Sequence, residues 1–287
     1  MIENVHWIIL ALLSALFGAI ALILKKKGLE HEHSLEYLGC FKVFEFLIML
    51  PFVYFIELNF PVSIYLMMYL ISMFITLALL LNNKGFKRIE FTKSIPLFNL
   101  GIIVTFFASM IVLDEILSWK QLTGLGIMMF GLYKVQSQHS LKETLKSFRS
   151  KGILLLIIAI TIMGIIAVFE KQLLLQTNIY SYLFIMYFFS IINSLIILTI
   201  FYDGYHGIIH GIKTEGKLIF GSAFFSTLSN LLFLAAISTA YLVLASIIKK
   251  SSNIFTMIVG GKYFHEEGYL KRTLWTIFII IGVLLVI

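Results

Sequence analysis

The sequence is poor in charged residues. Of its 287 residues only 13% are charged, against about 25% in soluble domains, while 60% are hydrophobic and the mean hydropathy is +0.99. A soluble fold of this length cannot cover so much apolar surface with so few polar side chains. The composition therefore predicts an integral membrane protein.

Cysteine and metal-binding patterns are also scarce. Cys40 is the only cysteine, which excludes a disulfide framework and a thiolate metal cluster. The seven histidines show no HExxH or related spacing, so we expect no metal and no cofactor. The net charge of +7 lies in short segments between apolar runs, and we interpret it as a sign of membrane topology rather than of nucleic-acid binding. No positive charge precedes the first apolar run, so we expect that run to stay as a helix rather than to be a cleaved signal peptide.

Long apolar runs fill the rest of the chain. A spanning helix needs about 20 apolar residues, and these runs do not alternate apolar with polar residues as barrel strands do. We therefore predict an all-α membrane protein with about ten transmembrane helices. Their approximate positions are 5–24, 35–56, 64–81, two arms within 95–135, 152–170, 180–202, 218–236, 241–264 and 270–287.

The second half of the sequence repeats the first. A shift of 151 residues, without a gap, aligns Glu115 with Glu266 and Gly131 with Gly282. The first and sixth predicted helices align at a slightly shorter shift, which a loop insertion explains. A period of this length is half a chain, far longer than the repeat of a solenoid. A duplicated half in a very apolar chain is typical of transporters.

Five helices in each copy would place the two copies in opposite orientations, because an odd number of spans ends on the other side of the membrane. We predict inverted repeats at 1–136 and 152–287, joined by a cytoplasmic linker at 137–151. All but five of the 22 Lys and Arg residues fall with the loops after the odd-numbered helices. The positive-inside rule then places both termini outside a multi-pass cell-membrane protein.

The two copies share a local arrangement of residues. It comprises Asp114-Glu115, Lys120-x-x-x-Gly124 and Gly131 in the first copy, and Lys249-Lys250-Ser251-Ser252, Glu266 and Gly282 in the second. Each set resembles the EamA module, and together they resemble EamA transporters of the drug/metabolite transporter superfamily over essentially the whole chain. The resemblance implies ten helices and a secondary transporter, commonly an exporter of small metabolites. Members are usually drawn with both termini inside, which opposes the charge bias of this chain.

The second predicted helix contains two charges about ten residues from either end. Lys42 and Glu45 are three residues apart and therefore share a face. A charge at this depth costs at least about 2.5–3.5 kcal/mol on insertion scales. Two interpretations stay open: a structural pair tucked into the bundle, or a cavity-lining site.

The ninth predicted helix carries a polar stripe. Lys249 shares this stripe with Ser252, Asn253 and Thr256, while Lys250 lies about 100° around the helix axis. Neither lysine has an acid within helical reach on its own helix. The pair is also similar to the Lys-Arg pair of plastid phosphate translocators. We predict an anion site with Lys249 facing the cavity and Lys250 flanking it or contacting the neighbouring helix. The alternative is a lysine that snorkels to the interface.

Other polar positions have more modest interpretations. Tyr187 is a candidate cavity wall. The row of serines from Ser222 to Ser229 is expected to pack against a neighbouring helix. Glu115 and Glu266 are expected to mark the membrane boundary, each near the N-terminus of the next helix.

These observations predict a secondary active transporter, and in particular an exporter of a small anionic or zwitterionic metabolite by alternating access. A flippase for a lipid-linked phosphate or sugar is the alternative. An intramembrane enzyme would need a nucleophile–base pair or metal ligands inside the bundle, so we expect no enzymatic activity. The expected partners are the small-molecule substrate and the lipid bilayer, with no nucleic acid; a homodimer is compatible with this class.

Overall fold

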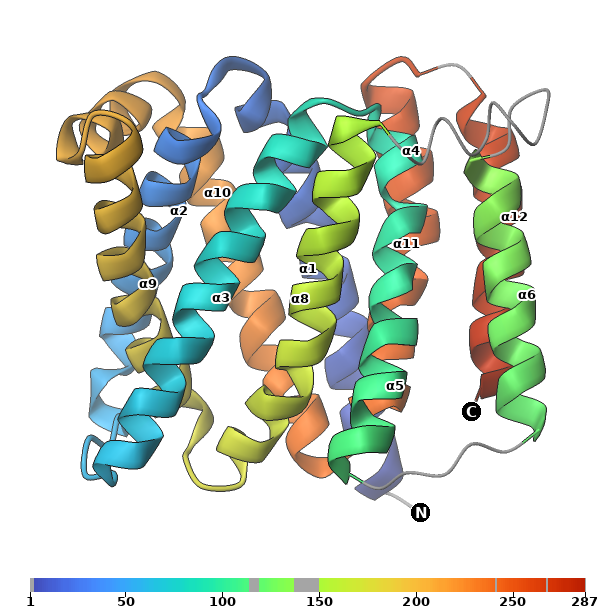
Figure 1. The fold of residues 1–287 in the computed structure, drawn as a ribbon, viewed down its shortest axis with the longest axis horizontal. Coiled ribbons are helices and arrows are strands. Elements are labelled where there is room, and N and C mark those ends of the chain that lie inside the picture. The colour runs from blue at the N-terminus through green and yellow to red at the C-terminus, as the bar shows by residue number, and fades with distance from the viewer. Residues whose placement is uncertain (1–2, 114–118, 137–149, 241, 267, 287) are drawn as a thin grey trace.

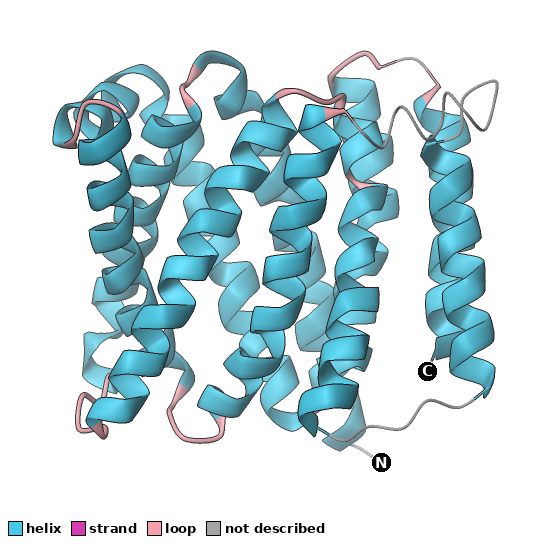
Figure 2. Cartoon of the chain, viewed as in Figure 1, coloured by secondary structure: helices cyan, strands magenta, loops and turns pink. Residues whose placement is uncertain are grey.

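A computed structural model describes residues 3–113, 119–136, 150–240, 242–266 and 268–286, and the elements in this part of the chain are all helical (Figures 1 and 2). The α-helices are α1 (Glu3–His31), α2 (Ser34–Met49), α3 (Val62–Lys87), α4 (Phe91–Ser94), α5 (Leu100–Leu113), α6 (Trp119–Gln136), α8 (Lys151–Leu174), α9 (Ile179–Phe201), α10 (Tyr205–Thr239), α11 (Leu242–Tyr263) and α12 (Tyr269–Val286). Two 3₁₀ helices, η1 (Leu50–Phe55) and η2 (Pro96–Asn99), complete the set.

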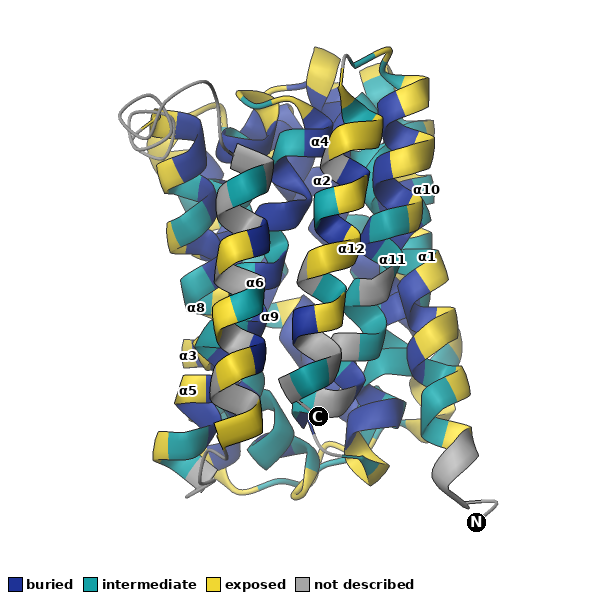
Figure 3. Cartoon of the chain, turned by 90° about the vertical axis from the view of Figure 1, so that its right-hand side faces the viewer, coloured by how far each residue is buried: buried dark blue, intermediate teal, exposed yellow. Residues whose placement is uncertain are grey.

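Seven helices within the described residues are long and apolar enough to cross a membrane. They are His6–His31, Ser34–Phe55, Val62–Lys87, Phe91–Val112, Lys151–Leu174, Ile179–Phe201 and Tyr205–Thr239. Many large apolar side chains are exposed, among them Leu12, Phe74 and Ile111. Exposed positions recur along the outside of the helices (Figure 3). Together with the seven helices of spanning length, this exposed apolar surface indicates a multi-pass membrane protein. The remaining long helices, α6, α11 and α12, lie alongside these seven in one bundle (Figure 1).

The three prolines lie where helices begin or change type. Pro51 falls in η1, so the helix predicted at 35–56 is an α-helix that ends at Met49 and continues as a 3₁₀ turn. Pro61 directly precedes α3, and Pro96 is the first residue of η2. Proline lacks the N–H that an α-helical interior uses, which explains why each one coincides with a break or a beginning.

The predicted end of the first helix at residue 24 is wrong, because α1 continues for about two more turns. Its lysines are held by groups on and after α3. Lys25 Nζ donates to Asn82 Oδ1 at 2.7 Å, and Lys26 Nζ donates to the carbonyl oxygens of Phe86 and Ile89, both at 2.7 Å. Because these acceptors bind the ammonium groups of Lys25 and Lys26, the helix continues through the lysine run instead of ending before it.

The eighth helix was predicted to begin at residue 218, close to the kink that divides α10 into two helical segments; the segment before the kink was not predicted. α10 starts at Tyr205, and Glu215 interrupts it with non-helical torsion angles (φ −123°, ψ 21°). The segment before this kink lies across one end of the bundle, and the segment after it runs through the bundle (Figure 1). Glu215 therefore separates a short helical segment at the end of the bundle from the helical segment that lines the interior.

The packing of the helices confirms the two repeats. α1 packs against α10 and α11, while its counterpart α8 packs against α3 and α5, the counterparts of α10 and α11. Two matched glycines permit these contacts: a Cβ on Gly18 would lie 3.0 Å from Ser229 Oγ, and one on Gly164 would lie 2.9 Å from Val104 Cβ. α1 and α8 run in opposite directions (Figure 1). Each half therefore packs chiefly against the other half, and the interior of the bundle lies between them.

Candidate functional site

A cavity of about 430 Å³ lies between the two repeats. Helices α1, α2, α3 and α5 contribute to its wall from the first half, and α8, α9, α10 and α11 contribute from the second. Most of the wall is apolar, as in pockets that bind small molecules. Its charged lining consists of four lysines and two glutamates, which are Lys25, Lys42, Lys249, Lys250, Glu45 and Glu170. With all six ionised, the cavity carries a net positive charge.

The two charges of α2 form a buried ion pair on this wall. Lys42 Nζ lies 2.7 Å from Glu45 Oε2, and the two side chains are 4% and 2% exposed. Ser226 of α10 donates to Glu45 Oε1 at 3.1 Å. Lys42 Nζ also lies 5.3 Å from the centroid of the Tyr187 ring, and the Tyr187 hydroxyl accepts a hydrogen bond from Asn230 Nδ2 at 3.1 Å. Lys42 and Glu45 are therefore both paired and part of the cavity wall, which is compatible with either interpretation from the sequence, and Tyr187 lies on the cavity wall as expected.

Both lysines of α11 line the cavity and diverge toward different neighbours. Lys249 Nζ lies 4.1 Å from the centroid of the Phe233 ring on α10, and Lys250 Nζ lies 5.6 Å from that of Phe98 in η2. Within the described part of the chain, neither ammonium makes a hydrogen bond or an ion pair within 4 Å. Glu170 of α8 attracts Lys249 from a longer distance. Lys250 was expected to flank the cavity or to contact a neighbouring element, and it does both, because it belongs to the cavity wall and lies beside Phe98.

The rest of the α11 stripe lines the cavity but already uses some of its hydrogen-bonding capacity. The hydroxyls of Ser252 and Thr256 donate to carbonyl oxygens one turn back, at 2.8 Å from Lys249 O and 2.9 Å from Ser252 O. Asn253 Nδ2 donates to Asn99 Oδ1 of η2 at 2.8 Å. Such bonds satisfy hydroxyls and amides within a membrane bundle. The stripe is therefore less free to donate to a ligand than the sequence pattern suggested.

The sequence matches the model of the EamA-like transporter family over residues 5–135 and again over residues 150–287. The chain belongs to the EamA-like transporter family. Among the 23 solved chains that it matches is a crystal structure of a protein with a TM-score of 0.60 and 10% identity, over 95% of this chain and 96% of that chain. At this identity the similarity shows the fold alone. No curated protein matches the sequence.

Family membership makes the protein a membrane transporter of the drug/metabolite transporter superfamily, whose EamA members are transporters and not enzymes. The cavity between the repeats of this EamA transporter brings together all eight residues that the sequence singled out as candidates. They are Lys42, Glu45, Tyr187, Lys249, Lys250, Ser252, Asn253 and Thr256.

The sequence pattern missed two charged residues of the EamA transporter's cavity. Lys25 was interpreted as part of the basic loop after the first helix, yet it lines the cavity together with its partner Asn82. Glu170 was interpreted as a helix end, yet α8 continues past it and its Oε1 accepts a hydrogen bond from the Tyr182 hydroxyl at 2.8 Å. In both cases the charge lies near the end of an apolar run, where sequence alone favours a boundary.

Ser222 and Ser229 of the serine row of α10 pack against α1, as predicted, whereas Ser226 donates to Glu45 of α2. Ser222 Oγ donates to Ala21 O at 3.0 Å, and Ser229 Oγ donates to Ser14 O at 2.8 Å. Ser14 Oγ donates in return to Ser229 O at 2.7 Å. These reciprocal bonds join α1 of the first repeat to α10 of the second.

The acidic residues of the EamA motif have separate outcomes. Asp114 and Glu115 lie outside the described residues. The carboxylate of Glu266 accepts hydrogen bonds from the backbone N–H groups of Phe91 and Thr92, at the beginning of α4. Glu266 therefore caps a helix of the first repeat, and it also lies three residues before α12, near the beginning of the next helix as predicted. Unpaired N–H groups at a helix beginning explain this preference for a carboxylate.

Proposed function

We propose that the protein is a secondary active transporter that exports a small anionic or zwitterionic metabolite by alternating access. The observation that carries the proposal is the pair of ammonium groups on α11. Lys249 and Lys250 face a cavity with more lysines than glutamates, and neither has a carboxylate within 4 Å in the described part of the chain. At 4 Å and an effective dielectric constant of 20, one ammonium attracts one anionic group by about 4 kcal/mol. A carboxylate or phosphate bound in the cavity would balance the positive charge of these ammonium groups.

The arrangement of the repeats supports the same mechanism. We propose that α6, α11 and α12 also cross the membrane, which gives ten spans in two inverted repeats. A cavity between such repeats opens to each side in turn when one repeat rocks against the other. The charge bias of the loops supports a topology with the join between the repeats in the cytoplasm and both termini outside. Export follows from the family resemblance rather than from the geometry.

The first experiment identifies the ligand class. Purified protein is screened by thermal shift against carboxylates, phosphates, amino acids and cations. Compounds that raise the melting temperature are then tested for transport in sealed proteoliposomes, both into empty vesicles and out of vesicles loaded with the compound. We expect anions or zwitterions to raise the melting temperature and to be transported. Movement of a lipid-linked phosphate across the bilayer, with no uptake of any soluble compound, would support the flippase alternative instead.

The second experiment tests the lysines. Lys249→Gln keeps the polarity and removes the charge, and we expect it to abolish transport with the fold intact. Lys250→Gln should have a smaller effect. Lys262→Gln is the matched control, because Lys262 is an exposed lysine on the same helix. Normal transport by the Lys249→Gln protein would refute the anion site.

A further inference from the structure

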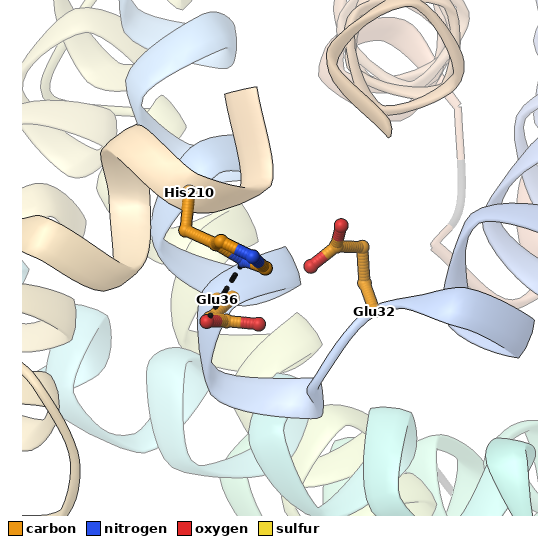
Figure 4. Close-up of side chains that lie close together, drawn as sticks. All are labelled: Glu32, Glu36 and His210. Carbon is orange, nitrogen blue, oxygen red and sulfur yellow. Dashed lines mark ion pairs between the residues drawn. The ribbon is translucent and has the colours of Figure 1, made fainter. Parts of the chain in front are cut away.

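A second cluster of ionisable side chains lies away from the cavity, at the end of the bundle where α1 turns into α2. It consists of Glu32, Glu36 and His210, and Figure 4 shows the three side chains converging. Their ligand atoms all lie within 4.8 Å of one another. His210 Nδ1 lies 3.3 Å from Glu36 Oε1. The first repeat supplies both carboxylates, and the second repeat supplies the imidazole.

Glu32 is the least satisfied member of this cluster. The residue is only 2% exposed, and its Oε2 atom has no hydrogen-bond partner among the described residues. Its other oxygen accepts a hydrogen bond from the Thr214 hydroxyl. Burial, and then the nearby Glu36 carboxylate, raise the pKa of the Glu32 carboxyl above its ordinary value. A buried carboxylate oxygen without a partner costs free energy unless a cation or a donor reaches it.

Close packing holds the imidazole near the carboxylates. A Cβ on Gly211 would lie 2.8 Å from Cys40 Sγ, so the segment of α10 before the kink can approach α2 only because residue 211 is a glycine. Cys40 Sγ donates to Ile208 O at 3.0 Å across the same contact. On the other side, Lys87 Nζ donates to Glu32 O at 2.8 Å and holds the turn between α1 and α2. Contacts on both sides therefore hold in place the backbone that carries Glu32, Glu36 and His210.

We propose that Glu32, Glu36 and His210 form a binding site for a divalent transition-metal ion such as Zn²⁺ or Mn²⁺. Two carboxylates and one imidazole suit such ions, whereas Mg²⁺ and Ca²⁺ prefer oxygen ligands alone. Two ligand atoms of one tetrahedral zinc ion lie about 3.4 Å apart, so a pair at the full 4.8 Å has to close by about 1.4 Å when the ion binds. His210 is exposed, which gives the ion a path from solvent and leaves room for water as a further ligand. The bound ion would join the two repeats at this end of the bundle.

The test measures metal binding by the full-length protein, purified without a polyhistidine tag and stripped with a chelator. After equilibrium dialysis against ZnCl₂, MnCl₂ or MgCl₂, the metal content is measured by mass spectrometry. We expect one Zn²⁺ or Mn²⁺ ion per chain and no Mg²⁺. Binding should raise the melting temperature, because the ion binds the folded state.

Two variants remove single ligands, and two matched variants serve as controls. Glu32→Gln and His210→Asn should each weaken binding at least roughly tenfold and lose the thermal shift. Glu30→Gln and His206→Asn change exposed residues on the same segments and should bind as the unaltered protein does. His210 is exposed, so its variant is expected to fold even if Glu32→Gln does not. Absence of stoichiometric Zn²⁺ or Mn²⁺ binding, or equal binding by His210→Asn, would refute the site.

Discussion

Replacing Lys42 with methionine removes one half of the ion pair whose atoms lie 2.7 Å apart on the cavity wall. Loss of one partner of a buried pair costs about 3–5 kcal/mol, because the remaining charge is left in a medium of low dielectric constant. Glu45 would keep its hydrogen bond from Ser226 and would still border the cavity. We therefore expect the lower end of that range, about 3 kcal/mol, for the loss in free energy of unfolding.

The double variant Lys42→Met with Glu45→Gln separates the pair from its surroundings. It leaves no stranded charge, so its loss should be smaller than the sum of the two single losses by about 2 kcal/mol. The measurement is reversible unfolding in mixed detergent micelles for all four proteins. Losses that add within about 0.5 kcal/mol would refute the coupling. Transport by the double variant then decides the role of the pair: a stable and active protein makes it structural, and a stable but inactive protein makes it part of the transport site.

Three further predictions concern packing, capping and topology. Gly85→Ala should lower the free energy of unfolding by about 1–3 kcal/mol, since its Cβ would lie 2.8 Å from Gly152 O. The control is Gly126→Ala, whose Cβ would have no neighbouring atom within 4 Å, and it should be neutral or stabilising in the same unfolding assay. Glu266→Ala should cost about 1–2 kcal/mol, because it removes the acceptor at the beginning of α4, and no change in thermal unfolding would contradict this. A reporter fused after Ile287 should signal from outside the cell; a cytoplasmic signal would reverse the predicted topology.

Much of the fold could be predicted from the sequence because a membrane restricts the choices. Apolar runs must satisfy their own backbone groups in lipid, so they indicate helices and their approximate positions. The repeated spacing of Glu115 with Glu266 indicated two related halves, and the family match and the packing confirmed them. The helix ends were less predictable. The extension of α1 past residue 24 depends on acceptors such as Asn82, which another helix supplies.

The residues of the candidate site, too, could be predicted only in part from the sequence. A charge in the middle of an apolar run is costly, so Lys42, Glu45 and Lys249 could be singled out from their positions alone. Lys25 and Glu170 could not, because a charge near the end of a run is equally compatible with the interface. Only the tertiary structure places them on the cavity wall.

The sequence by itself determined that the chain crosses a membrane, that it is built from two halves, and which charges are too deep to be incidental. Only the tertiary structure decided which groups meet. Glu36 and His210 lie in different repeats, and no spacing rule relates them until α10 folds across the end of α2. Hydropathy is a property of each residue, and the sequence therefore reveals it. A contact between distant residues depends on packing across the whole bundle, and the folded structure alone determines it.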